Sequence, residues 1–504
     1  MTARHTRPVV AALLAAVLAG AALRVVALDR SSFWLDESYG VDVARQPVAT
    51  LLSGQVGDAH TPPLYYVLLH LWMQWGDSDA WLRGLSALIS IVVLALAAWW
   101  LARHFGAGKA VLGTIVLAVS PYQVYFAQEA RMYSLATLLA LAVFMLEERA
   151  ARDRGPLVQL GLVAVGAAGL YTHYYLAFVL AGSALVRAVR MASGRGAGDS
   201  WRRLVLVHAG IGALFAPWLA VVGTLAASGG QQFHQSLPGV LPYAWFRFLF
   251  GFAVVPSTVT MKADPVATFL RAWPALVAVF GLGLLGAAGL WAAGRRAVGG
   301  AAAATVRHAA GVLSVVFAVP LVVSLAVPMY GERYLGIVQP LVLLVLVAGL
   351  LGLPRRAAAL AVGALLAVSV VGTARWTLGL AGAKEDWRGA VAAIEARARP
   401  GDRVVLDPWF NAWPVRRYLR REDLDVRTTR AVDPVTELLD CRRDRPQPGS
   451  SWWVVVSRSP RIAAAWESRV APCASLADST SYPAGVGITV LRFGVAGGPG
   501  TGPR

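Results

Sequence analysis

The sequence predicts an α-helical protein that crosses a membrane about eleven times and carries a small soluble α/β domain near its C-terminus. Three observations support this class. The chain has 504 residues, of which 57% are hydrophobic and only 15% are charged, and its mean hydropathy of +0.57 is far from that of a water-soluble protein. Long apolar runs recur as far as residue 375. After Arg375 the composition becomes that of a soluble domain.

The candidate spans are apolar runs, separated by short polar links, that are about long enough to cross a bilayer as helices. The first run, which begins near Val9, is too long for a signal peptide and has no small-residue cleavage site after it, so we take it as a span. The candidates are residues 8–28, 84–102, 110–127, 131–147, 156–171, 174–190, 204–223, 267–293, 309–327, 334–353 and 357–374.

Arginine carries nearly all of the positive charge, and the formal net charge is +18. A nucleic-acid-binding protein would gather this charge on one soluble face. Here it lies mostly in the short links between apolar runs, where basic residues mark the cytoplasmic side of a membrane protein. We therefore expect a multi-pass protein of the inner (plasma) membrane with a cytoplasmic N-terminus, an extracytoplasmic C-terminal domain, the lipid bilayer as a partner and no nucleic acid.

The composition divides the chain into three parts. Residues 1–375 form a transmembrane domain whose first outer loop is 29–83, residues 376–493 form the α/β domain, and 494–504 are expected to be a disordered tail. In the α/β domain, an amphipathic helix is expected at 386–399 and strands at 403–406, 452–456 and 488–493. Cys441 and Cys473 lie in this domain, where they either form a disulfide or remain as two buried thiols.

Some apolar runs are too short to span or are rich in glycine. Pro62–Trp75 and Tyr243–Phe250 are expected to be interfacial helices. Thr61 suits the N-cap of the first of them, with Pro62 as its first helical residue. Gly281–Gly286 lies within a span, where small residues allow helices to pack closely.

The first outer loop carries the acidic residues with the strongest functional signal. Asp36 and Glu37 follow the first span directly, behind the aromatic Trp34. Charge at the membrane surface is costly unless it has a purpose or a partner. A carboxylate there can be a general base for a hydroxyl acceptor or a ligand of a divalent cation. Alternatively, both acids only stabilise the N-terminus of a helix that runs to Leu52.

Other polar residues fall on the same outer face once the spans are drawn. His60 precedes a helix N-terminus that would suit an anion, and Tyr65 follows it. Ionisable residues at membrane depth are functional candidates, although structural ion pairs are a serious alternative. The remaining candidates on this face are Glu129, Arg131, Tyr133, His173 and Arg333, with Glu332 as an acid that can neutralise Arg333.

These motifs together resemble the GT-C superfamily of membrane glycosyltransferases, especially bacterial relatives of protein O-mannosyltransferases and lipid A aminoarabinose transferases. The resemblance rests on Trp34–Tyr39, His60–Tyr66, Arg83–Ser86 and Gln128–Tyr133, and it covers most of residues 1–350. One departure is that many relatives place a lysine before the paired prolines, where this chain has His60 and Thr61.

The resemblance implies inverting transfer of a hexose or pentose from a polyprenyl-phosphate-linked donor to a hydroxyl of a lipid, glycan or protein on the outer face. Asp36 would be the base, Glu37 would support it, and His60, Arg131 and Arg333 would meet the phosphate. Metal dependence differs among relatives, and a cation would use Asp36 and Glu37.

Two other functions fit a polytopic chain. A transporter or lipid flippase would have inverted repeats and broken helices that meet near the middle of the membrane, whereas the ionisable groups here lie at one face. A noncatalytic envelope assembly protein would tolerate replacement of Asp36 by Asn.

Overall fold

A computed structural model describes residues 3–54, 61–196, 199–227, 237–252, 265–295, 300–326, 330–380, 384–429, 450–457, 466, 474–485 and 487–495. The chain divides into two compact units. The larger unit comprises residues 1–28, 43–255 and 270–381. The smaller unit comprises residues 29–42, 256–269 and 382–504. Cys441, Cys473 and His60 lie outside the described residues, so the disulfide question stays open.

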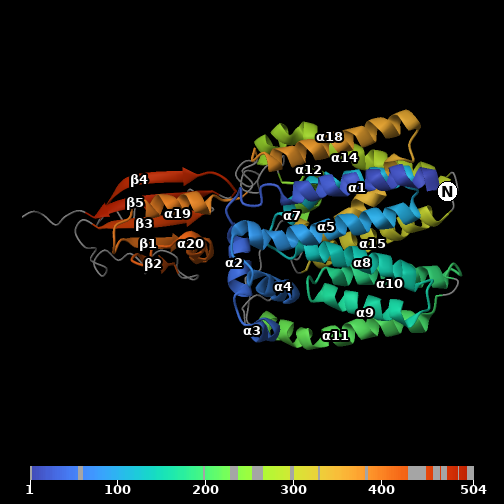
Figure 1. Cartoon of the computed structure of the whole chain (residues 1–504), viewed down its shortest axis with the longest axis horizontal. Helices are drawn as coiled ribbons and strands as arrows, with labels where there is room; N and C mark the ends of the chain where they lie inside the picture. The colour runs from blue at the N-terminus through green and yellow to red at the C-terminus, as the bar shows by residue number, and fades with distance from the viewer. Residues whose placement is uncertain are drawn as a thin grey trace, which may run out of the picture. The chain divides into compact units, whose positions relative to one another are not determined.

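The larger unit is a bundle of helices that run alongside one another (Figure 1). Every predicted span overlaps a helix or a run of two or three short helices. The helices are α1 (Ala3–Val25), α3 (Val48–Ser53), α4 (Leu64–Met73), α5 (Asp79–His104), α6 (Ala107–Ala118), α7 (Pro121–Ala127), α8 (Tyr133–Ala150), α9 (Pro156–Leu170), α10 (Leu176–Ala192), α11 (Trp201–Ala227), α12 (Leu237–Phe250), α14 (Pro265–Arg295), α15 (Ala301–Val323), α16 (Glu332–Leu335), η1 (Gly336–Val338), α17 (Gln339–Leu350) and α18 (Arg355–Thr377).

Within the described residues, seven helices are long and apolar enough to cross a membrane, or up to eight if the bent pair α6 and α7 is one span. The total of about eleven spans therefore stays a prediction. The runs at Pro62–Trp75 and Tyr243–Phe250 are helical, as expected, in α4 and α12.

The bend of 55° between α6 and α7 exposes backbone carbonyls inside the bundle, where no water replaces the lost helix bonds. Arg24 of α1, which is fully buried, donates to the carbonyls of Leu117 (3.3 Å) and Ala118 (3.1 Å). Thr373 Oγ1 of α18 donates to the carbonyl of Val119 at 2.8 Å. Side chains from two other helices thus stabilise the break, and α7 leaves it in a fixed direction.

Helices α14 and α17 cross at glycines. A Cβ atom on Gly289 would lie 1.8 Å from the carbonyl oxygen of Gly349, and one on Gly349 would lie 2.2 Å from that of Gly286. Such an approach is closed to any other residue, which explains why glycines recur here. The expected close packing of small residues is confirmed at Gly286, the last residue of the patch Gly281–Gly286.

The smaller unit is built on a five-stranded mixed sheet with strand order β2-β1-β3-β5-β4. β1 is parallel to β2 and β3, whereas β5 is antiparallel to β3 and β4. The predicted helix and three predicted strands are confirmed as α19, β1, β3 and β5. The elements are α2 (Leu35–Ala44, which continues into the larger unit), α19 (Trp387–Glu395), β1 (Arg403–Asp407), η2 (Trp409–Asn411), α20 (Ala412–Tyr418), β2 (Asp425–Thr428), β3 (Ser451–Ser457), β4 (Ala474–Tyr482) and β5 (Ile488–Val495).

Successive side chains of a strand point to opposite faces of the sheet, and apolar side chains form a layer on each face. On one face Val404 and Leu406 of β1 pack in a cluster with Ile394 of α19 and Val415 of α20. On the other face Val405 packs with residues of β3 and β5. The sheet is therefore buried on both sides, which accounts for the uninterrupted apolar run in β3.

Candidate active site

The link between α7 and α8 holds Arg131 at the end of the larger unit where α8 begins. Gln128 anchors this link, because its Nε2 donates to the carbonyls of Leu23 (2.9 Å) and Val26 (2.8 Å). The indole of Trp376 donates to Gln128 Oε1 at 2.8 Å. Arg131 is only 7% exposed. Its guanidinium is thus held on a link that two neighbouring helices fix in place.

The guanidinium itself is held by two side chains, one just before α4 and one in its first turn. Arg131 Nη1 donates to the hydroxyl of Tyr66 at 3.1 Å, and Nη2 lies 3.5 Å from Thr61 Oγ1. The prediction that Thr61 caps α4 is wrong. The helix begins at Leu64, and the residue before it, Pro63, makes no side-chain cap hydrogen bond. The hydroxyl of Thr61 accepts from Arg131 instead.

Tyr65 supports the same link from α4. Its hydroxyl is hydrogen-bonded to Ser86 Oγ of α5 at 2.9 Å, and Ser86 Oγ donates to the carbonyl of Arg131 at 3.2 Å. Tyr65 is fully buried. Its hydroxyl therefore contacts a side chain, Ser86, that in turn binds the backbone of Arg131.

Aromatic rings from three segments gather beside Arg131. Tyr133 and His173 have ring centroids 6.2 Å apart, and His173 lies 5.3 Å from Tyr334. The backbone N–H of Tyr175 donates to His173 Nδ1 at 3.2 Å. Burial, followed by the positive charge of Arg131, lowers the pKa of His173 to about 3. The neutral ring therefore carries its proton on Nε2, as a hydrogen-bond donor.

Further charges surround the ring of Tyr133. Arg333, Arg131 and Glu129 all act on it electrostatically, and Glu129 is fully buried. Arg333 stands at the start of α16, next to the buried Glu332. The larger unit therefore gathers two sequence-predicted arginines and one acid around Tyr133.

Arg247 of α12 is a residue that the sequence did not single out for the site. It is 7% exposed, and its guanidinium lies over the ring of Phe252, 4.0 Å from the centroid. Its charge acts on Tyr122, together with those of Glu332 and Arg333. The only sequence signal is an arginine inside the aromatic run Tyr243–Phe250, which predicts an interfacial helix.

Asp36 and Glu37 lie in the first turn of α2, in the smaller unit. The helix dipole favours acids there, as the structural alternative predicts. The two differ in surroundings, because Glu37 is fully buried whereas Asp36 is partly exposed. Lys384 Nζ lies 2.9 Å from Glu37 Oε2, and both side chains are buried.

A resident metal finds little support in the residues described. They contain no group of three or more His, Cys, Asp or Glu side chains that could hold an ion. Glu37 already accepts a hydrogen bond from the ammonium of Lys384, so its carboxylate is poorly suited as a ligand of a metal ion. The proposal of a cation at Asp36 and Glu37 therefore remains untested.

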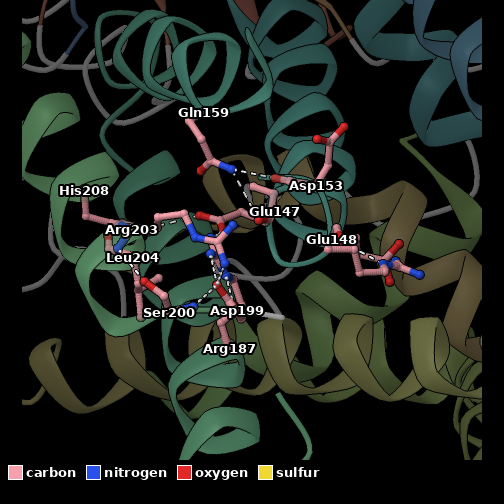
Figure 2. A network of polar contacts seen from close by, with 12 residues as sticks. Glu147, Glu148, Asp153, Gln159, Arg187, Asp199, Ser200, Arg203, Leu204 and His208 are labelled. Carbon is pink, nitrogen blue, oxygen red and sulfur yellow. Dashed lines mark hydrogen bonds and ion pairs between the residues drawn. The ribbon is translucent and has the colours of Figure 1, made fainter. Parts of the chain in front are cut away.

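The far end of α8 carries a separate charge network. Arg187 of α10 donates to both oxygens of Asp199 (2.9 and 3.0 Å) and to Glu147 Oε2 (2.6 Å), with all three side chains nearly inaccessible. His208 of α11 lies 3.2 Å from the other Glu147 oxygen. Figure 2 shows Arg187 between the two acids. This network binds α8, α10 and α11 together, and we regard it as structural.

The predicted residues thus fall into three groups. Tyr65, Glu129, Arg131, Tyr133, His173 and Arg333 lie in the larger unit, around the link that opens α8. Asp36 and Glu37 lie in the smaller unit. His60 lies outside the described residues.

Comparison with solved structures identifies the fold. The chain matches ArnT from Cupriavidus metallidurans in the apo state with a TM-score of 0.56 and 16% identity, over 99% of this chain and 100% of that one. The chain therefore shares the fold of this ArnT. The predicted class, a helical polytopic membrane protein with a small C-terminal α/β domain, is thereby confirmed, while the number of spans stays a prediction.

Two further solved structures have the same fold. ArnT from Cupriavidus metallidurans bound to undecaprenyl phosphate matches with a TM-score of 0.53 and 15% identity, over 99% of this chain and 100% of that one. The Archaeoglobus fulgidus oligosaccharyltransferase in its apo form matches with 0.50 and 11%, over 83% of this chain and 64% of that one. No protein-family model and no curated sequence matches the chain.

Proposed function

We propose that this protein is a membrane glycosyltransferase that moves a hexose or pentose from a polyprenyl-phosphate donor to a hydroxyl of a lipid, glycan or protein. The observation that carries the proposal is the cluster around Tyr133, on which the charges of Arg131 and Arg333 both act, in a chain that shares the fold of ArnT. Solved ArnT with undecaprenyl phosphate supports a lipid phosphate as the group that such a fold receives.

The arginines suit the leaving group. Negative charge grows on the phosphate as the bond to the sugar breaks, and fixed cationic donors with little water around them stabilise that charge most effectively. Arg131 is nearly buried and already held by Tyr66 and Thr61, so little of its conformational freedom remains to be lost on binding. Arg333 and Arg247 add charge from two other segments, and neutral His173 offers an Nε2–H donor.

Asp36 is proposed as the general base. It would take the proton of the acceptor hydroxyl while that oxygen forms a bond to the anomeric carbon, as the bond from that carbon to the phosphate oxygen breaks. The polyprenyl phosphate leaves with the bonding electrons. Because this is a single displacement, the configuration at the anomeric carbon inverts.

The proposed location is the outer face of the inner membrane. Basic residues such as Arg187 and Arg203 gather at the end of the bundle opposite Arg131, as the rule for cytoplasmic ends predicts. Nucleotide sugars are absent outside the cytoplasm, whereas a lipid-linked donor can enter from the bilayer. The N-terminus would then be cytoplasmic and the α/β domain extracytoplasmic.

The test is donor turnover by purified protein in lipid nanodiscs. With a radiolabelled polyprenyl-phosphate sugar and an envelope extract as acceptor, wild type should release polyprenyl phosphate and label a product. Asp36→Asn should lower that rate by about 10²- to 10⁴-fold, the usual contribution of a general base. Asp42→Asn, on the same helix, is the matched control. Full activity of Asp36→Asn would refute the assigned base, and no turnover by wild type with any donor would refute the function.

A further inference from the structure

We propose that Lys384 is a positioning residue whose ion pair with Glu37 sets the orientation of the first turn of α2, and with it the direction of the Asp36 carboxylate. This inference rests on the proposed function, because it gives Glu37 and Lys384 a role in presenting the base. It places Glu37 outside the chemistry itself and assigns a role to a lysine 347 positions away in sequence.

Water cannot take the place of either partner in this ion pair, because both side chains are buried. The side chains of Lys384 and Glu37 are 1% and 0% exposed, and Nζ lies 2.9 Å from Oε2. Loss of either side chain would remove a short, buried ion pair from the other, which is strongly unfavourable. The carboxylate of Glu37 must therefore remain turned towards Lys384 while the unit is folded.

Helix geometry converts this constraint into an orientation for Asp36. Successive helical residues point about 100° apart around the axis. If Glu37 is turned inwards to Lys384, the preceding residue cannot share its direction. Asp36 is in fact partly exposed, whereas Glu37 is not exposed at all. The pair therefore sets the rotation of the turn that carries the base.

The residues on either side of the pair are joined as well. Ser32 Oγ donates to the carbonyl of Glu385 at 2.7 Å and accepts from the backbone N–H of Trp387 at 3.0 Å. The backbone N–H of Phe33 donates to the hydroxyl of Tyr418 at 2.6 Å. The segment that enters α2 is thus anchored to the segments around α19 and α20, and the ion pair extends this anchoring into the helix.

The experiment uses the full chain in nanodiscs with four variants: Lys384→Met, Lys384→Arg, the double variant Glu37→Met/Lys384→Met, and Arg388→Met as the matched control. Arg388 pairs with Asp29 between the same two segments, but that pair is exposed (41% and 68%), so its loss should matter little. Three quantities are measured: kcat, KM for the polyprenyl-phosphate donor, and hydrogen exchange of the amides of α2.

For Lys384→Met we expect kcat to fall at least tenfold with the donor KM within twofold, because the donor phosphate is assigned to arginines of the other unit. Exchange in α2 should rise. The double variant should recover most of the lost kcat because it removes both buried charges, and Lys384→Arg should retain more activity than Lys384→Met. Arg388→Met should behave as wild type.

Unchanged kcat and unchanged exchange in Lys384→Met would overturn the inference, as would a change in KM alone. Failure of the double variant to recover activity while α2 regains its protection would also overturn it, since Glu37 would then act directly. The exchange measurement needs no turnover. If the wild type transfers no sugar, the proposed function fails, while the structural coupling is still tested separately.

Discussion

Replacement of Arg131 by Met should weaken binding of a polyprenyl phosphate more than any other single change in the larger unit. The guanidinium is 7% exposed and held by Tyr66 and Thr61 at 3.1 and 3.5 Å. A hydrogen bond to a charged group contributes about 1.5 to 3 kcal/mol, and each 1.4 kcal/mol is tenfold in affinity, so the expected loss is about 10- to 100-fold. Methionine keeps the unbranched apolar stem of the side chain and lacks the guanidinium with its charge and donors.

The assay is titration of undecaprenyl phosphate into purified protein in nanodiscs, followed by native mass spectrometry. Arg45→Met is the matched control, because Arg45 belongs to the same unit but forms an exposed ion pair with Asp77. A dissociation constant for Arg131→Met within twofold of wild type, in protein that remains folded, would refute the role given to this arginine.

Three other predictions follow from buried groups. The lowered pKa of His173 means that the unfolded chain binds its proton below about pH 6.5 and the folded chain does not, so stability should fall as pH drops towards 3, by about 2 kcal/mol at pH 5. Thermal melts at pH 7.5 and 5 should show a smaller loss for His173→Gln, and an equal loss would contradict the assignment. Arg24→Met removes the side-chain donor to the carbonyl of Ala118 at the α6–α7 break, whereas Leu117 keeps a backbone donor, so the protein should be destabilised by about 1 to 3 kcal/mol. An unchanged melting temperature would show that the break does not depend on Arg24. Arg187→Met removes the guanidinium that the buried Glu147 and Asp199 share, leaves them only the weaker partners His208 and Arg203, and should cost about 3 to 5 kcal/mol. It should lower the folded yield without altering the donor KM of the surviving protein, and a change in KM would contradict a purely structural network.

The helices and strands were predictable because their signals are local. The length of an apolar run indicates a span, and a short run rich in apolar, β-branched or aromatic residues indicates a strand such as Arg403–Asp407 or Ile488–Val495. The position of Tyr133 near His173 was also predictable, because span order alone places the links before α8 and α10 at one end of the bundle. The total number of spans was harder to predict, since several helices are short and one span is bent.

The partners of individual side chains were not predictable. Nothing near Glu37 in the sequence points to Lys384, and nothing near Arg24 points to the carbonyls of Leu117 and Ala118. These contacts join distant segments and depend on how helices rotate when they pack. Thr61 shows the same limit, because a good local cap was overridden by a tertiary hydrogen bond to Arg131.

The most direct test of the account is the composition of the cell envelope in a strain that lacks this protein. Mass spectrometry of its lipids, glycans and proteins should show one component lighter by the mass of a hexose or pentose residue, together with accumulation of the polyprenyl-phosphate sugar. Wild-type protein should restore the component, and Asp36→Asn should not. An unchanged envelope, or full restoration by Asp36→Asn, would contradict the account.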